Sequence, residues 1–144
     1  MRMILTLGLG LALGASGALA SATTVALANE TKPPLREVSQ IDDAMLWVAM
    51  AIEISDKCTE IDPRTLKGLS VLYDLRGQAL DMGYSDTEIR AYIRSRDEKA
   101  RMRARGEKYV KSKGLNPSDP AALCKLGHSE IARSSRIGVL LKAK

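Results

Sequence analysis

Between residues 39 and 132, apolar residues fall into five segments that turn-forming residues separate. The clearest apolar run is Ala44 to Ile52, nine residues without a polar side chain, with Ser39 upstream as a candidate N-cap. Methionine, alanine and leucine favour helix over a buried strand, so the pattern predicts a helix from about Ser39 to Cys58. A helix that is apolar on all sides is buried on all sides, and we expect this one to be the central element of the fold.

The second segment begins where an N-cap residue is followed directly by proline, at Asp62-Pro63. It ends at Gly83, because glycine readily takes the left-handed conformation that follows a helix C-terminus. Between these points leucines and a tyrosine recur at helical spacing, which predicts a buried stripe along one face of a second helix. The stripe comprises Leu66, Leu69, Leu72 or Tyr73, and Leu80.

The third segment carries a capping box formed by Ser85 and Glu88, in which each side chain bonds the backbone N–H of the other residue. Tyr84 and Ile89 flank the box and fit a hydrophobic staple, so a helix is predicted to begin here. The residues expected to face inward are Ile89, Tyr92 and Ile93.

The fourth segment is strongly basic and only thinly apolar. Ser95 and Glu98 repeat the capping-box spacing, so a new helix can begin at Arg96, although a kinked continuation of the preceding helix fits equally well. The segment ends at Gly114. Its apolar positions predict a surface helix with one narrow buried seam, and they are Met102, Gly106, Tyr109 and Val110.

The fifth segment starts at Asp119-Pro120, again an N-cap followed by proline. An apolar tail at residues 137–141 is expected to fold back onto the bundle. Together these patterns predict an all-α domain, a single bundle of four or five helices over residues 39–144. Proline blocks helix formation at Pro33 and Pro34, so residues 29–38 are predicted to be an extended linker.

The N-terminal segment predicts export. Met3 to Ala28 contains no charged side chain and follows a basic residue, Arg2. A basic start, an apolar core and small residues at the cleavage position are typical of a secretory signal peptide, so residues 1–28 are predicted to be one, cleaved after Ala20 or Ala28. An uncleaved membrane anchor is the alternative, since the run is long enough to cross a bilayer.

Export changes the interpretation of the two cysteines. Outside the cytoplasm, Cys58 and Cys124 are expected to form one intramolecular disulfide between the end of the first helix and the fifth helix. A redox-active pair is the alternative, but the chain lacks the C-x-x-C spacing of such pairs.

Charge is divided unevenly along the chain, whose net charge is +5. Residues 29–89 hold 6 basic and 12 acidic side chains, whereas residues 90–113 hold 10 basic and 3 acidic ones. Either the acidic part packs on the basic part, or the basic part forms a surface for an anionic partner. Export argues against nucleic acid, which leaves an envelope protein or an anionic membrane surface. The candidate surface comprises Arg94, Arg101, Arg105 and Lys108.

The sequence holds no recognisable catalytic or metal-binding pattern. His128 is the only histidine, and no catalytic partner adjoins it on the same helix face. The paired acids Asp42-Asp43 and Asp97-Glu98 diverge by about 100° on a helix, so they are expected to stabilise helix N-termini rather than meet at a substrate. We therefore predict no catalytic residue, metal ligand, cofactor or small-molecule substrate, and a protein that is not an enzyme.

Three blocks of the sequence resemble a known family. They are Pro34-Leu35-Arg36-Glu37-Val38 leading into Ile41-Asp42, then Gly83-Tyr84-Ser85-Asp86 through Glu98-Lys99-Ala100-Arg101-Met102-Arg103-Ala104, and Asp119-Pro120-Ala121 with Cys124 through Ile137-Gly138-Val139-Leu140-Leu141. In these blocks the chain is similar to a small exported alphaproteobacterial family of unknown function. The resemblance covers nearly all of the chain after the signal, implies a Gram-negative periplasm and supports one disulfide, but it implies no activity.

These observations favour a non-enzymatic periplasmic binding protein, an accessory of an envelope complex, with the basic helix as its contact surface. The alternative is a small periplasmic holdase chaperone, an analogy of size, helicity and single disulfide with acid-stress chaperones. That alternative predicts that mild acid exposes apolar surface. An enzyme is the third hypothesis, and a deep cleft that combines His128 with a carboxylate would favour it.

Overall fold

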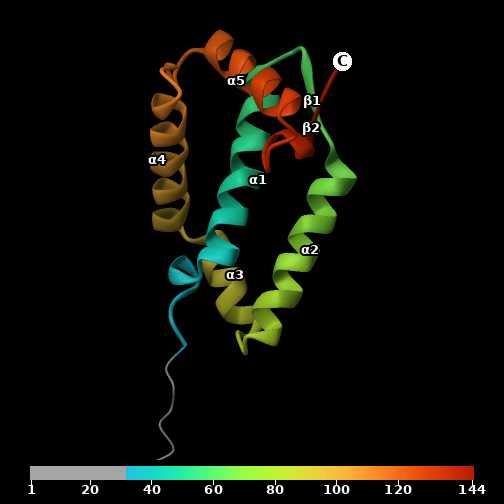
Figure 1. Cartoon of the computed structure of the whole chain (residues 1–144). Coiled ribbons are helices and arrows are strands. Elements are labelled where there is room, and N and C mark those ends of the chain that lie inside the picture. The colour runs from blue at the N-terminus through green and yellow to red at the C-terminus, as the bar shows by residue number, and fades with distance from the viewer. Residues whose placement is uncertain (1–31) are drawn as a thin grey trace, which may run out of the picture. The chain divides into compact units, whose positions relative to one another are not determined.

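The computed structural model describes residues 32–144, which form a mostly helical domain (Figure 1). Both predicted cleavage positions, the signal peptide and the alternative anchor fall in residues 1–28, outside the described part. The helices are α1 (Ser39–Lys57), α2 (Thr65–Asp81), α3 (Asp86–Arg94), α4 (Arg96–Ser112) and α5 (Pro120–Ala132), and the 3₁₀ turns are η1 (Leu35–Glu37) and η2 (Gly138–Leu140). No helix of the described part is long and apolar enough to cross a membrane.

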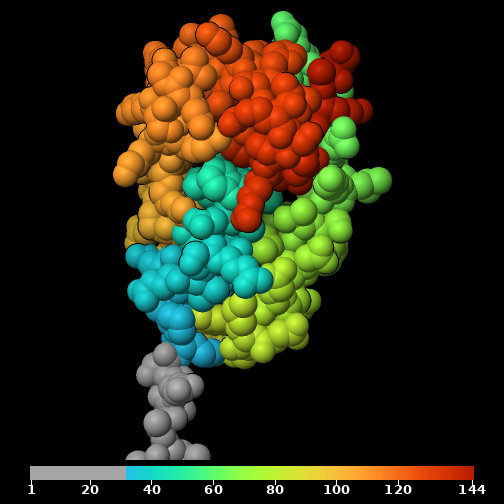
Figure 2. All heavy atoms as spheres, in the orientation of Figure 1, coloured from blue at the N-terminus to red at the C-terminus, as the bar shows by residue number. Residues whose placement is uncertain are grey.

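Helix α1 is the central element, as predicted. It contacts α2, α4 and α5, and Figure 1 shows it running between α4 on one side and α2 on the other. The larger apolar cluster lies where α1 meets α5 and the C-terminal segment; its most deeply buried members include Ile54, Ile61, Leu126, Ile137 and Leu141. Figure 2 shows the atoms of α5 and of the C-terminal segment, coloured orange to red, gathered over one end of this domain.

A second, smaller apolar cluster lies at the N-terminal end of α1. It joins Ile41 of α1 to Leu35 of η1, to Leu75 of α2 and to Ile89 of α3. Leu35 is only 5% exposed, so the segment predicted as an extended linker over residues 29–38 contains a 3₁₀ turn whose leucine is part of the core.

The local signals for the starts of α3, α4 and α5 are confirmed. Ser85 and Glu88 form the complete capping box of α3, and Ser95 accepts a hydrogen bond from the backbone N–H of Glu98, so α4 is a new helix rather than a continuation. Asp119 caps α5, with Pro120 as its first residue. At Ser39 the prediction was one residue off, since Ser39 is the first residue of α1 and Val38 is its N-cap.

The prediction of an all-α domain was incomplete, because the structure contains a short antiparallel sheet. Strand β1 (Ile61–Pro63) pairs with β2 (Leu141–Ala143), with Asp62 opposite Lys142. Asp62-Pro63 therefore does not begin a helix, and α2 starts at Thr65. The strand depends on a partner about eighty positions away, which no local pattern reveals. The same pairing confirms that the apolar tail folds back.

The predicted buried stripe of α2 was wrong except at Leu72, the alternative to Tyr73, which packs partly buried against the larger core. Leu66 is 84% exposed and Tyr73 is 72% exposed, and Leu69 and Leu80 are exposed as well. The buried side chains of α2 are instead Leu75 and Ala79, on the opposite face, with Val71 and Leu72 partly buried. Helix α2 is apolar on two faces, and the domain covers the one with the smaller residues.

Two other burial predictions were too strong. Within the run Ala44–Ile52 of α1, Ala49 and Ile52 are exposed. Ile93 of α3 is 47% exposed, whereas Ile89 is buried and Tyr92 is partly buried. Both Ala49 and Ile93 border the region described next.

Candidate functional site

A cleft of about 380 Å³ lies along the seam between α1 and α4. Its walls are mostly apolar, and the apolar residues that line it are Met45, Leu46, Ala49, Met50, Ile93, Met102, Val110 and Leu123. Leu46, Met50, Val110 and Leu123 are buried members of the larger core, so the floor of the cleft is the outer side of that core.

One glycine sets the spacing of the two cleft walls. At Gly106 of α4, an added Cβ atom would lie 2.7 Å from Sδ of Met50 on α1. The absence of a side chain therefore lets the Met50 thioether pack directly on the α4 backbone. Met45, Met50 and Met102 supply flexible, polarisable side chains that adapt to an apolar occupant.

Charged side chains border the cleft. Lys99 and Arg103 of α4 line it one turn apart and are exposed. Glu107, one turn further along α4, and Glu53 of α1 also line it and are exposed. The cleft thus combines an apolar floor with a cationic stretch and an acidic stretch along the α4 wall.

A cluster of ion pairs fastens α4 to the first turns of α1. Asp42 is 4% exposed and accepts hydrogen bonds from three side chains. Nη1 of Arg101 lies 3.0 Å from its Oδ2, and the Tyr92 hydroxyl donates to it at 2.5 Å. The third donor is Arg105. Arg105 also pairs with Asp43, with Nη2 and Oδ1 2.5 Å apart. The cluster consists of Asp42, Asp43, Tyr92, Arg101 and Arg105, and we call it the α1–α4 joint.

Glu98 extends the α1–α4 joint toward η1. It is 7% exposed, accepts a hydrogen bond from Nε of Arg101 at 2.8 Å, and pairs with Arg36. Glu98 is also a lining residue of the cleft. One of the carboxylates that hold α4 in place therefore lies directly at the candidate binding region.

The two buried carboxyl groups of the joint keep their negative charge. Burial raises the pKa of Asp42, but the hydrogen bonds from Arg101 and Tyr92 and the charges of Arg101 and Arg105 outweigh it and lower the pKa overall. Burial likewise raises the pKa of Glu98, but the hydrogen bonds and charges of Arg101 and Arg36 outweigh it and lower the pKa overall. Burial, together with the bond to Asp42, raises the pKa of Tyr92.

These contacts divide the basic surface predicted from the sequence. Arg101 and Arg105 point into the α1–α4 joint, so they are engaged by carboxylates of the same chain rather than offered to a partner. Arg94 and Lys108 are exposed, but neither lines the cleft. For the two arginines of the joint, the acidic part of the chain packs on the basic part, which was the other interpretation of the charge pattern.

Sequence reasoning singled out Arg101 and Arg105 but not the roles of Asp42, Lys99 and Arg103 in this arrangement. Asp42 was expected to stabilise a helix N-terminus, and it does lie in the first turn of α1, but its main contacts are across the domain. Lys99 and Arg103 were not separated from the other basic residues of their helix. Their position on the cleft side of α4 depends on how α4 is rotated about its axis against α1, which the thin apolar seam indicates only approximately.

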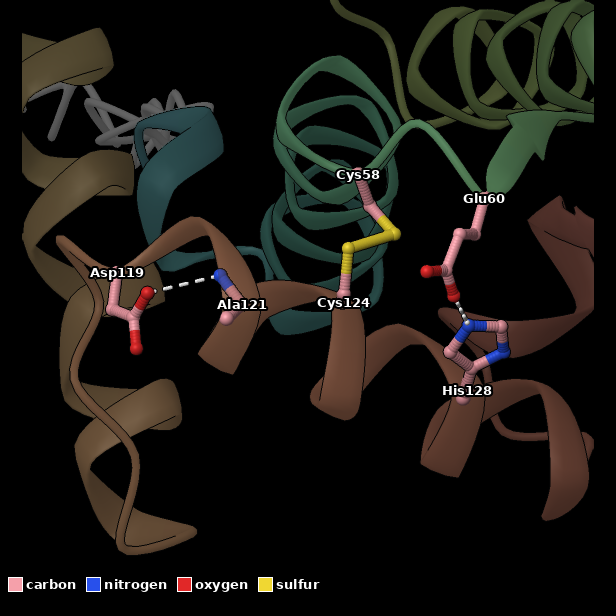
Figure 3. The surroundings of a disulfide bond; sticks show 6 residues. All are labelled: Cys58, Glu60, Asp119, Ala121, Cys124 and His128. Atoms are coloured by element: carbon pink, nitrogen blue, oxygen red, sulfur yellow. Dashed lines mark hydrogen bonds and ion pairs between the residues drawn. A yellow bond between two sulfur atoms is a disulfide. The ribbon is translucent and has the colours of Figure 1, made fainter.

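The predicted disulfide is present. Cys58, at the C-terminal end of α1, is bonded to Cys124 of α5, with 5.0 Å between their Cα atoms. Figure 3 shows the bond joining the two helices, with Glu60 and His128 nearby.

His128 lies outside the cleft. Its Nε2 is 3.0 Å from Oε2 of Glu60, and both side chains are exposed (Figure 3). Sγ of Cys58 lies within 4.8 Å of the ligand atoms of Glu60 and His128, but it is bonded to Sγ of Cys124 in the disulfide. Glu60 and His128 alone offer fewer than the three protein ligands of a catalytic zinc site.

A further buried carboxylate connects α4 to α5. Glu130 is fully buried, and its Oε1 accepts a hydrogen bond from the Tyr109 hydroxyl at 2.7 Å and pairs with Arg133. Tyr109 also makes an edge contact with Trp47 of α1, with ring centroids 5.5 Å apart. These contacts fix the far end of α4, so both ends of the cleft wall are anchored by polar interactions.

The fold and the cleft define a small helical domain with one disulfide and an open apolar cleft. Within this class the chain belongs to DUF5333, a family of unknown function whose sequence pattern matches residues 33–142. Comparison with curated proteins and with solved structures gave no significant match.

Proposed function

We propose that this protein is a non-enzymatic periplasmic binding protein, an accessory of the cell envelope, and that its ligand is an anionic amphiphile with a single apolar chain. The observation that carries the proposal is the α1–α4 cleft, in which an apolar floor is bordered by the cation pair Lys99 and Arg103. The apolar chain lies on the floor and the acidic head group contacts the two cations.

The dimensions of the cleft fit such a ligand. Small-molecule sites have volumes of roughly 300–1,000 Å³ and mostly apolar walls with a few polar groups. At 380 Å³ this cleft is near the lower limit, which favours one chain over several. Between Glu98 and Val110 the α4 wall is about 18 Å long, given a rise of 1.5 Å per residue.

Charge favours an acidic head group over a basic one. Cationic side chains outnumber acidic ones on the exposed surface of α4, and they raise the local potential at the rim beyond what Lys99 and Arg103 contribute. Glu53 and Glu107 leave the opposite end of the rim acidic, so the head group is directed toward Lys99 and Arg103. The sequence predicts an envelope protein or an anionic membrane surface as the partner of the basic helix. The ligand proposed here is a small anionic molecule instead, and it contacts Lys99 and Arg103.

Titration with dodecanoate, below the concentration at which it forms micelles, tests this proposal. We expect saturable binding at 50 mM salt that weakens as salt rises, since the head-group contact lies at the surface. The K99E/R103E variant is expected to bind at least about tenfold more weakly, which corresponds to about 1.4 kcal/mol.

The matched control is R94E/K108E, which changes the net charge equally at exposed positions outside the cleft. It is expected to bind dodecanoate within about twofold of the original protein. A second control is dodecyltrimethylammonium, which has the same chain with a cationic head group and is expected to bind more weakly than dodecanoate. No binding of dodecanoate, or equal losses in the two double variants, would contradict the proposed site.

One observation favours the holdase chaperone as a second candidate. The α1–α4 joint depends on two buried carboxylates, Asp42 and Glu98, so strong acid would loosen the wall of an apolar, methionine-lined cleft. In that case, lowering the pH to about 3 should increase binding of an apolar dye and should protect an aggregating client protein. If dye binding is unchanged and the client aggregates as before, the chaperone candidate is excluded.

A further inference from the structure

We propose that the outer face of α2 pairs with the same face of a second copy of this chain, as an antiparallel helix pair centred on Tyr73. This proposal is independent of the ligand proposed for the cleft. It starts from the apolar stripe that the domain leaves uncovered.

The outer stripe of α2 consists of Leu66, Leu69, Tyr73 and Leu80. Their exposed fractions are 84%, 46%, 72% and 36%, and no described residue packs over the stripe as a second layer. Their spacing of three, four and seven residues places them on one face of the helix, and Figure 1 shows α2 at the edge of the domain. An apolar stripe of this length on a soluble domain is typical of a helix–helix interface.

The stripe also contains a gap that can accept a side chain of a second helix. Gly77 lies on the same face, and an added Cβ there would meet nothing within 4 Å. In an antiparallel pair with Tyr73 at the two-fold axis, Leu69 of each helix lies opposite Gly77 of the other. Leu66 then lies opposite Leu80, and the two Tyr73 rings meet at the centre. Each large residue therefore faces either a gap or another apolar side chain, as in knobs-into-holes packing.

Charges beside the stripe favour the same arrangement. Lys67, Asp74 and Asp81 lie along one flank, are exposed, and form no ion pair with another residue of the described part. An antiparallel two-fold pair brings this flank of one helix against the same flank of the other. Lys67 near one end of α2 then lies beside Asp81 of the second copy. This attractive contact occurs twice, whereas the two Asp74 side chains meet once near the two-fold axis, so attractive contacts outnumber the repulsive one.

The expected dimer is weak. Helix α2 has 17 residues, so a single helix pair is about 25 Å long. Such a contact buries less surface than the roughly 1,200–2,000 Å² of stable interfaces, so we expect dissociation in the micromolar range or above.

Sedimentation velocity over a concentration series from about 5 to 500 µM measures the pairing. We expect the original protein to shift from monomer to dimer across this range, and the L66K/Y73K variant to stay monomeric. The matched control is I52K, which places a lysine at another exposed apolar residue, 52% exposed on α1, and is expected to dimerise normally. Far-UV circular dichroism verifies that all three proteins are folded.

Charge exchange then tests the orientation. K67E and D81K are each expected to weaken the dimer several-fold, and the K67E/D81K double variant is expected to restore it, because the two charges only exchange places in the antiparallel pair. Original protein that stays monomeric at 500 µM would overturn self-pairing in favour of a helix from an unlike partner. Dimers that survive L66K/Y73K, or a double variant as weak as the two single ones, would overturn the proposed face or its orientation.

Discussion

At the scale of single residues, the glycines of this domain differ sharply in what they tolerate. Gly138 begins η2, and an added Cβ would lie 1.9 Å from the backbone oxygen of Glu130 in α5. The C-terminal segment therefore contacts α5 through its backbone. By contrast, nothing lies within 4 Å of a Cβ added at Gly68, inside α2. The close approach of the η2 and α5 backbones requires a glycine at position 138, whereas Gly68 only lowers the helix propensity of α2.

We accordingly expect opposite effects from the same substitution. Gly138→Ala should lower the free energy of unfolding by about 3 kcal/mol, because Glu130 cannot move away without disturbing α5. Gly68→Ala should raise it by about 0.5–1 kcal/mol, since alanine restricts the unfolded chain and favours helix. Urea denaturation of both variants measures the difference. If Gly138→Ala proved neutral, η2 would not pack on α5 as described.

At the scale of elements, the α1–α4 joint links the folding of the domain to pH. The pKa values of Asp42 and Glu98 are lowered in the folded protein, so the unfolded chain takes up protons first as the pH falls. Glu88 adds to the effect, because hydrogen bonds from the backbone and side chain of Ser85 and from Lys32 lower its pKa to about 2. The stabilisation that these carboxylates contribute to the folded state is complete above the ordinary pKa range of carboxyl groups and is lost below about pH 4.

The Asp42→Asn variant tests this dependence. At pH 6 it should lower the free energy of unfolding by about 3 kcal/mol, because Arg101 and Arg105 lose a buried charged partner. At pH 3 the difference from the original protein should shrink, since Asp42 of the unfolded chain is then largely protonated and part of the stabilisation from the folded carboxylate is lost. Asp43→Asn is the control, and as an exposed partner it should cost less than about 1 kcal/mol. A loss for Asp42→Asn that is equal at both pH values would contradict the role of the joint.

The elements also differ in how far the sequence predicts them. Capping boxes and N-cap–proline pairs act within one turn, so the starts of α3, α4 and α5 could be predicted from adjacent residues. Strand β1 could not, because it exists only through β2. Helix α2 has apolar residues on both faces, and periodicity alone does not decide which face the domain covers. The cleft was missed for a related reason, since Lys99 and Arg103 gain their position from how α4 packs against α1.

At the scale of the whole molecule, the disulfide joins the two helices that enclose the larger core. Cys58 and Cys124 are separated by 66 positions, and closing a loop of that length restricts the unfolded chain by about 4 kcal/mol. Cys58 is 1% exposed, so the bond adds to packing that is already present. This contribution is large beside a total stability of about 5–15 kcal/mol.

Reduction should therefore weaken the domain without abolishing it. We expect the reduced protein to keep its helical circular dichroism at 25 °C and to unfold with a free energy about 4 kcal/mol lower than the oxidised protein. The C58A/C124A variant serves as a control, because reductant should leave its unfolding unchanged. Equal stabilities of the oxidised and reduced forms would show that the bond does not restrain the unfolded chain.

The same bond has a consequence for proteolysis. The loop that it closes contains α2, α3 and α4, and so includes the exposed stripe and one wall of the cleft. A protease that cuts this loop once would leave two fragments, one with α1 and the other with α5, and the disulfide would keep them covalently joined. A nicked molecule would therefore migrate intact in a non-reducing gel and separate only after reduction, and it would keep the larger core in which both cysteines lie.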